Sequence, residues 1–503
     1  MLNRRHVTAG ALGAAVALVM AACGNAPGAP GATSMTSSSS MSEAPASTTE
    51  PSSTAITVSP LLPTPSTTRT MPAVTSALTS GVVPTTAAAR PTDTAVTSKP
   101  AVATSTPTNV SVGVVVTEAD RARAARLVAG MSLADRAASV LMITGSEAIG
   151  TGLLATRHVG GVILFASDGV VDGTSKGTPA QVAAVTAKLR ADAAADPAGV
   201  PPLVAVDQEY GLVQRLKNGF TSFPRAAELG AIDDIDAAAT ITRQVATAAA
   251  QEMRAVGVTV DFAPVFGVLP DDGSPSAIGQ YGRSYGSDPQ RVARLVAAAV
   301  TGYQHGGVVA GMKHFPGLAR IGADSHVTLP TLNVDCADWN AHEAVPARAG
   351  IDAGALMVMT GHVLLPNAGE RTLPASVSPV VVGQLLEGDG AAGCVGMGFD
   401  GVTVTDSMQM APITARYRSG AAAVAALNAG EDLILMPANP TQAIDGIVAA
   451  VHDGSLSAER LDDAATAVLA LRIASARVPT PPLDVVDSAA HRALADKAFA
   501  AAR

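Results

Sequence analysis

A short, nearly continuous apolar run recurs about eight times between residues 140 and 436, each time followed by a turn and a longer alanine-rich stretch. Runs without polar alternation are typical of parallel strands that are buried on both faces. We therefore predict strands at 140–144, 161–166, 203–207, 259–263, 308–313, 355–360, 402–406 and 432–436.

The stretches between these runs repeat their apolar residues with a helical period. Clear examples are 235–256, 289–305 and 419–429, and several such stretches end at a glycine, where a helix commonly stops. Alternating strands and helices predict an α/β fold. Eight alternations in one region favour a single (β/α)8 TIM-like barrel, with an open doubly wound sheet as the alternative.

Polar side chains follow several runs at the point where the predicted strand ends. Asp207 ends the third run, Lys313 and His314 the fifth, and Asp406 the seventh, while His362 lies just after the sixth. Each residue alone could be an ordinary loop residue in solvent, and for His362 a purely structural role is equally open. Because the carboxyl ends of barrel strands open onto one mouth, we expect these side chains to meet there.

The beginning of the chain has the pattern of an export signal. Arginines at 4–5 precede an apolar run at 9–20, which is too short to span a membrane, and Met20-Ala21-Ala22-Cys23 is a small-residue motif that ends in cysteine. We predict a lipoprotein signal peptide over 1–22 and a lipid anchor on Cys23, which would hold the protein at the outer face of the cell membrane, in the cell-wall space. An ordinary secretory signal is the alternative, and the arginine pair leaves both general and twin-arginine export open.

Composition divides the rest of the chain. Residues 23–116 are rich in Ser, Thr, Pro and Ala, so they lack the apolar side chains that a core requires, and we predict a disordered linker that acts as a stalk. The predicted barrel occupies 117–476, and a C-terminal tail follows at 477–503.

Charge and cysteine content narrow the function. The formal net charge is -9, with no basic run beyond the extreme N-terminus, which argues against nucleic acid. Aromatic residues make up only 3%, too few for the stacking platforms that hold long polymers, so a short pocket for a small polar ligand fits better. Cys336 and Cys394 form either a disulfide or two buried thiols. We expect no metal, since no HxH or HExxH spacing occurs, and no cofactor.

Several motifs carry a family resemblance. Lys313-His314-Phe315-Pro316-Gly317 leads through a glycine-rich loop to Asp324-Ser325-His326. This arrangement resembles glycoside hydrolase family 3, and specifically its bacterial β-N-acetylglucosaminidases. The resemblance extends over the whole predicted barrel, because other motifs of that family occur in the expected order. They lie before this segment at 207–209 with 214–215, 262–265 and 283–289, and after it at 404–408.

The chemistry of glycoside hydrolysis fits these residues. The reaction usually needs a carboxylate below the anomeric carbon and a proton donor beside the leaving oxygen. Asp406, at the end of an apolar strand, suits the nucleophile's task, and its attack would retain the anomeric configuration. The resemblance assigns proton transfer to His326, with Asp324 as the partner of its ring. It also implies that the sugar is held by Asp207, Arg215, Arg283, Lys313 and His314.

The sequence departs from the family pattern at three places. Residues 210–212 are Tyr-Gly-Leu, where the family usually has two glycines and an arginine. Gly267 stands where an aspartate is common, and Leu318-Ala319 replaces the usual His-Gly pair. These changes leave the predicted nucleophile and dyad intact, but they affect the expected pocket lining and the loop.

We expect an exo-acting hydrolase that releases terminal N-acetylglucosamine from peptidoglycan-derived saccharides and works as a monomer. A β-N-acetylglucosaminide phosphorylase, or another β-glycosidase, is one alternative, because a neutral histidine does not repel incoming phosphate. A non-catalytic sugar-binding lipoprotein is the other. The intact Asp406, Asp324 and His326 argue against it, whereas Tyr210 and Leu212 argue for it.

Overall fold

The computed structural model describes residues 113–165 and 177–503. The predicted signal peptide, Cys23 and nearly all of the predicted linker lie outside the described residues, so these remain predictions. Within the described part of the chain, no helix combines the length and the apolar character needed to cross a bilayer.

Eight parallel strands form one sheet in the order β11-β8-β7-β6-β3-β2-β1-β12. The two ends of this order meet, because Val404 of β11 bridges to Leu433 just before β12. The sheet therefore closes into a barrel, which confirms the predicted architecture and excludes the open doubly wound sheet. The strands are β1 Leu141–Thr144, β2 Gly161–Ile163, β3 Leu203–Val206, β6 Val260–Asp261, β7 Val309–Phe315, β8 Met357–Thr360, β11 Val402–Thr405 and β12 Ile434–Leu435.

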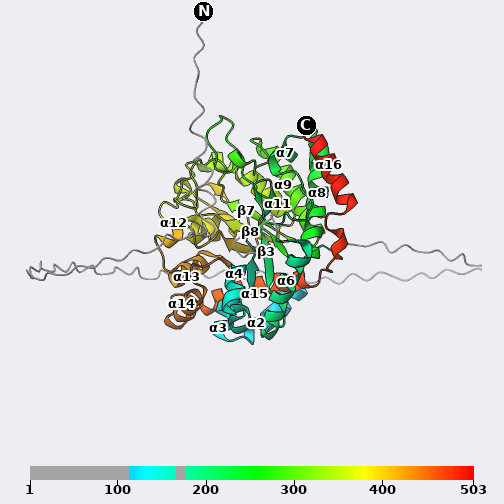
Figure 1. The fold of residues 1–503 in the computed structure, drawn as a ribbon. Coiled ribbons are helices and arrows are strands. Elements are labelled where there is room, and N and C mark those ends of the chain that lie inside the picture. The colour runs from blue at the N-terminus through cyan, green and yellow to red at the C-terminus, as the bar shows by residue number, and fades with distance from the viewer. Residues whose placement is uncertain (1–112, 166–176) are drawn as a thin grey trace, which may run out of the picture. The chain divides into compact units, whose positions relative to one another are not determined.

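Helices surround the strands (Figure 1). The three helices predicted most clearly are α8 Ile235–Ala255, α9 Pro289–His305 and α13 Ser419–Ala429. Their starts follow from the sequence: at α9, the Asp288 side chain accepts a hydrogen bond from Gln290 N and a proline occupies the first turn. The other α-helices are α2 Glu118–Ala129, α3 Leu133–Ser139, α4 Gly145–Thr151, α5 Leu153–Arg157, α6 Pro179–Asp192, α7 Ala226–Gly230, α10 Cys336–Ala341, α11 Ala344–Asp352, α12 Ala411–Thr414, α14 Pro440–Asp453, α15 Ala458–Ala476 and α16 Ala489–Ala501.

Shorter elements decorate the loops. Two small antiparallel hairpins pair β4 with β5 and β9 with β10. Their bounds, with those of the 3-10 turns and one π-helical turn (η6), are β4 Gln208–Tyr210, β5 Val213–Gln214, β9 Gly390–Ala391, β10 Cys394–Val395, η2 Ala193–Ala195, η3 Gly279–Tyr281, η4 Pro366–Ala368, η5 Ala375–Val377, η6 Val380–Leu386 and η7 Leu483–Val485.

Alternation along the strands creates two apolar layers. One cluster of buried side chains fills the barrel interior, and a larger one lies between the strands and the helices. In β11, Val402 and Val404 point inward, and in β3, Leu203 and Ala205 do the same. Because successive side chains point to opposite faces, the next inward positions fall at the carboxyl ends of the strands, where the pocket is expected.

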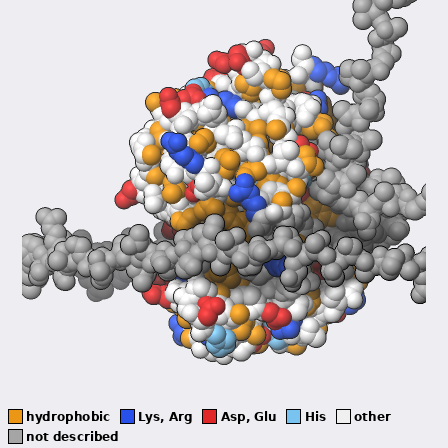
Figure 2. Space-filling view, turned by 90° about the vertical axis from the view of Figure 1, so that its left-hand side faces the viewer, with side chains coloured by type: hydrophobic (Ala, Val, Ile, Leu, Met, Phe, Trp, Pro, Cys, Tyr) orange, Lys and Arg blue, Asp and Glu red, His pale blue; other side chains and the backbone are white. Residues whose placement is uncertain are grey.

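Charged side chains do not gather on the face drawn in Figure 2. There the lysine and arginine side chains of the described residues are dispersed among acidic and apolar ones. This distribution accords with the formal net charge of -9.

The segment predicted as a C-terminal tail contains α16, which packs against α8 (Figure 1). The buried carboxylate of Glu252 in α8 makes the connection. It accepts hydrogen bonds from Thr221 N at 3.0 Å, Thr221 Oγ1 at 2.5 Å, Asp487 N at 3.1 Å and His491 Nδ1 at 2.9 Å. Glu252 thus docks the tail on α8, together with Arg254, whose guanidinium donates to the carbonyls of Val478 and Pro479.

Replacing Glu252 with alanine should leave these buried hydrogen-bond donors without an acceptor. We expect the free energy of unfolding to fall by about 3 kcal/mol, because buried groups that lose a charged partner keep their desolvation cost. Urea denaturation followed by circular dichroism measures the change. The exposed Glu459→Ala should change it by less than about 0.5 kcal/mol. Equal effects of the two substitutions would contradict the assigned role.

Candidate active site

The inward rows of the strands end in charged side chains at the barrel mouth. Asp406 continues the row of Val402 and Val404, and Asp207 continues the row of Leu203 and Ala205. Lys313 likewise lies four residues beyond the inward-facing Val309 in β7. The two-residue repeat therefore places all three side chains at the carboxyl end of the barrel, as predicted.

Lys313 is the centre of a buried ion-pair network. Its Nζ lies 2.7 Å from Asp207 Oδ1 and 2.6 Å from Glu209 Oε1, and only 3% of its side chain is exposed. Arg283 binds Glu209 with two contacts, Nε to Oε2 at 2.7 Å and Nη2 to Oε1 at 2.9 Å. Arg215 Nη2 lies 3.4 Å from Asp207 Oδ2. Four predicted site residues thus meet in one network.

The network stays charged at neutral pH. Burial alone would raise the pKa of Glu209, but the positive charges of Arg283 and Lys313 outweigh burial and hold that pKa at about 2. Burial would lower the pKa of Lys313, but Asp207 and Glu209 raise it above its ordinary value. Each buried charge is therefore compensated by an opposite one.

Glu209 is the site residue that sequence reasoning missed. It belongs to the motif at 207–209, but the strand ends give no reason to single it out. It lies in β4, beyond the barrel strand, and only the fold brings it to Lys313 and Arg283. Its signal in the sequence is its place two residues after Asp207.

The unusual Tyr210 does not enter the mouth. Its backbone adopts φ 64°, a conformation that favours glycine, and its ring is buried in the layer between strands and helices. There it meets Phe223 edge-on, with ring centroids 5.5 Å apart. Leu212, at the tip of the hairpin, is 48% exposed. The ring of Tyr210 therefore belongs to the outer core and not to the lining of the mouth.

The other two departures compensate for each other. A Cβ added to Gly267 would lie 2.6 Å from the Cβ of Ala319, closer than two such atoms can approach. An aspartate at 267 is thus incompatible with alanine at 319, whereas the glycine usual at 319 would leave room for it. Glycine at 267 therefore leaves the space that the side chain of Ala319 occupies.

Three histidines influence the pKa of Asp406. Burial would raise the pKa of Asp406, but His314, His362 and His326, in that order, together with a hydrogen bond from Ser407 N at 2.7 Å, lower it. Asp406 is therefore an anion at neutral pH, as a nucleophile must be. Burial lowers the pKa of His314 well below its usual value, although Asp406 opposes the shift, so this ring is neutral.

His362 binds the backbone beside Asp406. Its side chain is fully buried, and its Nε2 donates a hydrogen bond to Ser407 O at 2.9 Å. Nδ1 then accepts one from Ser376 Oγ at 2.7 Å. Of the two roles left open for His362, these contacts favour the structural one, which is to fix the backbone beside Asp406.

The Asp324-Ser325-His326 loop reaches the mouth. His326 Nδ1 lies 2.7 Å from Asp324 Oδ1, and the same oxygen accepts the backbone N–H of His326 at 2.9 Å. The carbonyl of His326 accepts a hydrogen bond from Ala411 N at 3.1 Å, five residues after Asp406. The loop is therefore tied to the segment that follows Asp406.

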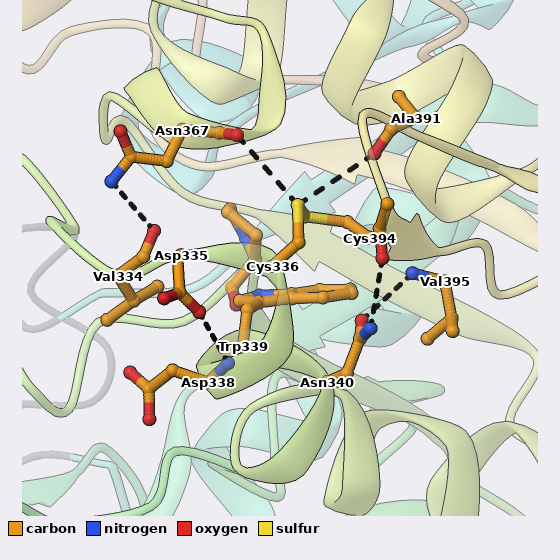
Figure 3. The surroundings of a disulfide bond; sticks show 12 residues. Val334, Asp335, Cys336, Asp338, Trp339, Asn340, Asn367, Ala391, Cys394 and Val395 are labelled. Atoms are coloured by element: carbon orange, nitrogen blue, oxygen red, sulfur yellow. Dashed lines mark hydrogen bonds between the residues drawn. A yellow bond between two sulfur atoms is a disulfide. The ribbon is translucent and has the colours of Figure 1, made fainter.

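Two further predictions concern cysteines and metals. Cys336 and Cys394 are joined by a disulfide, with Cα atoms 4.5 Å apart, which links α10 to β10 (Figure 3). In residues 113–165 and 177–503, no group of three or more His, Cys, Asp or Glu side chains is arranged to hold a metal ion.

The barrel matches a known family. The family model described as "Glycosyl hydrolase family 3 N terminal domain" matches residues 135–471. The chain belongs to glycosyl hydrolase family 3. The expectation of a glycoside hydrolase of this family is thereby confirmed.

Relatives within family 3 are similar over most of their length. The chain is 36% identical over 295 residues to a β-hexosaminidase of Thiobacillus denitrificans, which covers 57% of this chain and 74% of that protein. A β-N-acetylglucosaminidase structure from Paenibacillus sp. FPU-7 has a TM-score of 0.64 and 34% identity, covering 73% of this chain and 68% of that one. A β-N-acetylhexosaminidase structure from Beutenbergia cavernae gives 0.59 and 31%, covering 68% and 98%.

The buried charge of Glu209 predicts a pH dependence of stability. Its pKa is about 2 in the folded protein, against an ordinary 4.5, so its stabilising contribution is complete above pH 4.5 and is lost as the pH falls toward 2. Glu209→Gln should lower the free energy of unfolding by about 3 kcal/mol at pH 7 and by clearly less at pH 3. Denaturant titrations at both pH values measure the difference.

Asp236→Asn is the matched control, since Asp236 pairs with Arg294 at the exposed surface. Its cost should stay below about 0.5 kcal/mol at both pH values. A cost of Glu209→Gln that does not decrease between pH 7 and pH 3 would contradict the depressed pKa.

Proposed function

We propose that the protein is an exo-acting, retaining β-N-acetylglucosaminidase. It removes terminal N-acetylglucosamine from cell-wall saccharides through a covalent intermediate on Asp406, with His326 and Asp324 as the acid/base dyad. The protein acts as a monomer held at the membrane by a lipid on Cys23. The names of its family 3 relatives support the sugar, and the export pattern at 1–23 supports the cell wall as its source.

One observation supports the proposal: the loop that carries His326 is hydrogen-bonded to the segment that follows Asp406, 80 residues further along the chain. Asp406 ends β11, and the His326 loop is hydrogen-bonded to the segment just after it. Burial would raise the pKa of Asp406, but His314, His362 and His326, in that order, lower it, so His326 belongs to the electrostatic surroundings of Asp406.

Two steps follow from this arrangement. In the first, Asp406 attacks the anomeric carbon while the bond to the leaving oxygen breaks, and protonated His326 gives its proton to that oxygen. In the second, neutral His326 takes a proton from water, which attacks the same carbon and releases Asp406. Two inversions give overall retention. Asp324 orients the ring through Nδ1 and stabilises its charged form.

The ion-pair network supplies sugar recognition. Asp207 pairs with Lys313, and Glu209 connects Lys313 to Arg283, so these side chains need little reorganisation when hydroxyl groups bind. Charged hydrogen bonds of this kind distinguish a hydroxylated ring from an apolar ligand. The neutral, buried His314 lies beside Asp406, where it contributes a polar contact to the sugar without adding charge.

An activity panel of aryl β-glycosides tests the proposal. We expect the N-acetylglucosaminide to be cleaved without phosphate, with release of the free β-anomer, and the glucoside to be cleaved far more slowly. Asp406→Ala should lower kcat by about 10⁴-fold or more, because it removes the nucleophile while leaving the fold intact. Product formation is followed by absorbance and by proton NMR of the anomer.

Each alternative has its own outcome in the panel. Strict dependence on phosphate, with a sugar phosphate as product, would identify a phosphorylase. Binding of N-acetylglucosamine without any turnover would identify a non-catalytic sugar-binding protein. Turnover that survives in Asp406→Ala would refute the assigned nucleophile.

A further inference from the structure

The segment between the catalytic strand and the dyad rests on α10. Trp339, a fully buried residue of α10, donates its indole N–H to Pro316 O at 2.9 Å. Its ring meets Phe315 edge-on, with centroids 5.9 Å apart. The chain is therefore held immediately after Lys313 and His314.

A second grip lies just before the dyad. Arg320, four residues before Asp324, binds Glu343 with Nε and Nη2, each at 2.6 Å, and binds Asp338 Oδ2 with Nη1 at 2.8 Å. Glu343 is 1% exposed, and a Cβ added to Gly317 would lie 2.5 Å from its Cγ. The loop thus lies directly against Glu343, which precedes α11.

Helix α10 is short, and other contacts hold it in place. α10 has six residues, too few to be stable alone. Its first residue, Cys336, is bonded to Cys394 in the hairpin β9–β10 (Figure 3). Asn340 adds two hydrogen bonds to the same hairpin, from Nδ2 to Gly393 O at 3.1 Å and from Val395 N to Oδ1 at 2.9 Å.

We propose that this unit is a positioning device for the acid/base loop and that the disulfide locks it. We call it the loop anchor: Arg320, Cys336, Asp338, Trp339, Glu343 and Cys394. The inference rests on the proposed function, because it assigns the anchor to His326 and Asp324. With the disulfide formed, α10 is fixed and the dyad is held over the mouth. With both thiols reduced, α10 keeps the two hydrogen bonds of Asn340 and the contact of Cys336 Sγ with Ala391 O at 3.9 Å, but it loses its covalent link to the hairpin, and the dyad loses its alignment.

The geometry predicts a selective defect. Asp207, Lys313 and Asp406 stand at the ends of barrel strands, whereas the loop that carries His326 is held on one side by the anchor. Loosening the anchor should therefore impair proton donation more than nucleophilic attack. A leaving group that departs without protonation should be almost unaffected, whereas a poor leaving group should depart much more slowly.

The test compares two substrates in the full chain. For Cys336→Ser/Cys394→Ser we expect kcat/KM to fall about tenfold or more with phenyl N-acetyl-β-glucosaminide, and less than about twofold with the 2,4-dinitrophenyl compound, because only the first needs a general acid. Reduction of the wild-type protein should produce the same selective loss. The double variant retains Cys23 and should not respond to the reductant, so it controls for other effects of the reagent.

A second variant guards against misfolding. Trp339→Phe keeps an aromatic ring and removes the N–H bonded to Pro316, and we expect the same selective loss with a smaller size. An equal loss on both substrates, or no loss on either, would overturn the proposal.

Hydrogen exchange separates this inference from the proposed function. If the oxidised wild type cleaves neither substrate, the proposed function fails, and the anchor is judged by exchange alone. Faster amide exchange at 318–328 after reduction, with the barrel strands unchanged, supports the anchor. Unchanged exchange in that segment contradicts it.

Discussion

The site depends on one constraint: the charged side chains that are buried at the mouth of the barrel must be paired with opposite charges. Parallel strands send alternate side chains into the barrel, and apolar packing fills that interior until the rows of β3, β7 and β11 reach the mouth. There Lys313 is buried and would be costly without its two carboxylate partners. Because Lys313 joins β7 to the residues after β3, and Glu209 joins Lys313 to Arg283, the network fixes three separate segments around one pocket.

Much of this arrangement is predictable from the sequence alone, for physical reasons. Continuous apolar runs indicate buried strands, and strand ends in a barrel must meet, so the positions of Asp207, Lys313 and Asp406 at strand ends are enough to group them. Long-range contacts are not predictable in the same way. Nothing local shows that Glu209 reaches Lys313, or that the tail at 477–503 docks on Glu252, because both depend on where distant helices and hairpins pack.

Departures from the family pattern are misleading when each is considered alone. Tyr210 was expected to change the pocket lining, but its backbone is in the left-handed region and its ring packs in the outer core. Gly267 and Ala319 were expected to affect the pocket lining and the loop separately, but the two positions lie against each other, and glycine at 267 leaves room for the side chain of Ala319. The loop that carries Asp324 and His326 likewise depends on contacts that a local motif does not reveal. It packs against α10 and the residue before α11, and α10 is held by a disulfide. Function here rests on contacts between segments as much as on the catalytic residues.

The central claim is that the carboxylate of Asp406 and the ring of His326 serve the same anomeric carbon. Trapping with a fluorinated N-acetylglucosaminyl donor, whose intermediate forms faster than it breaks down, tests this most directly. Peptide mapping by mass spectrometry should find one sugar on the peptide that contains Asp406. Water should release that sugar more slowly when His326 is replaced by alanine, because the base that activates the water is then missing. A sugar attached to a different carboxylate, or release that is unaffected by His326→Ala, would contradict the account.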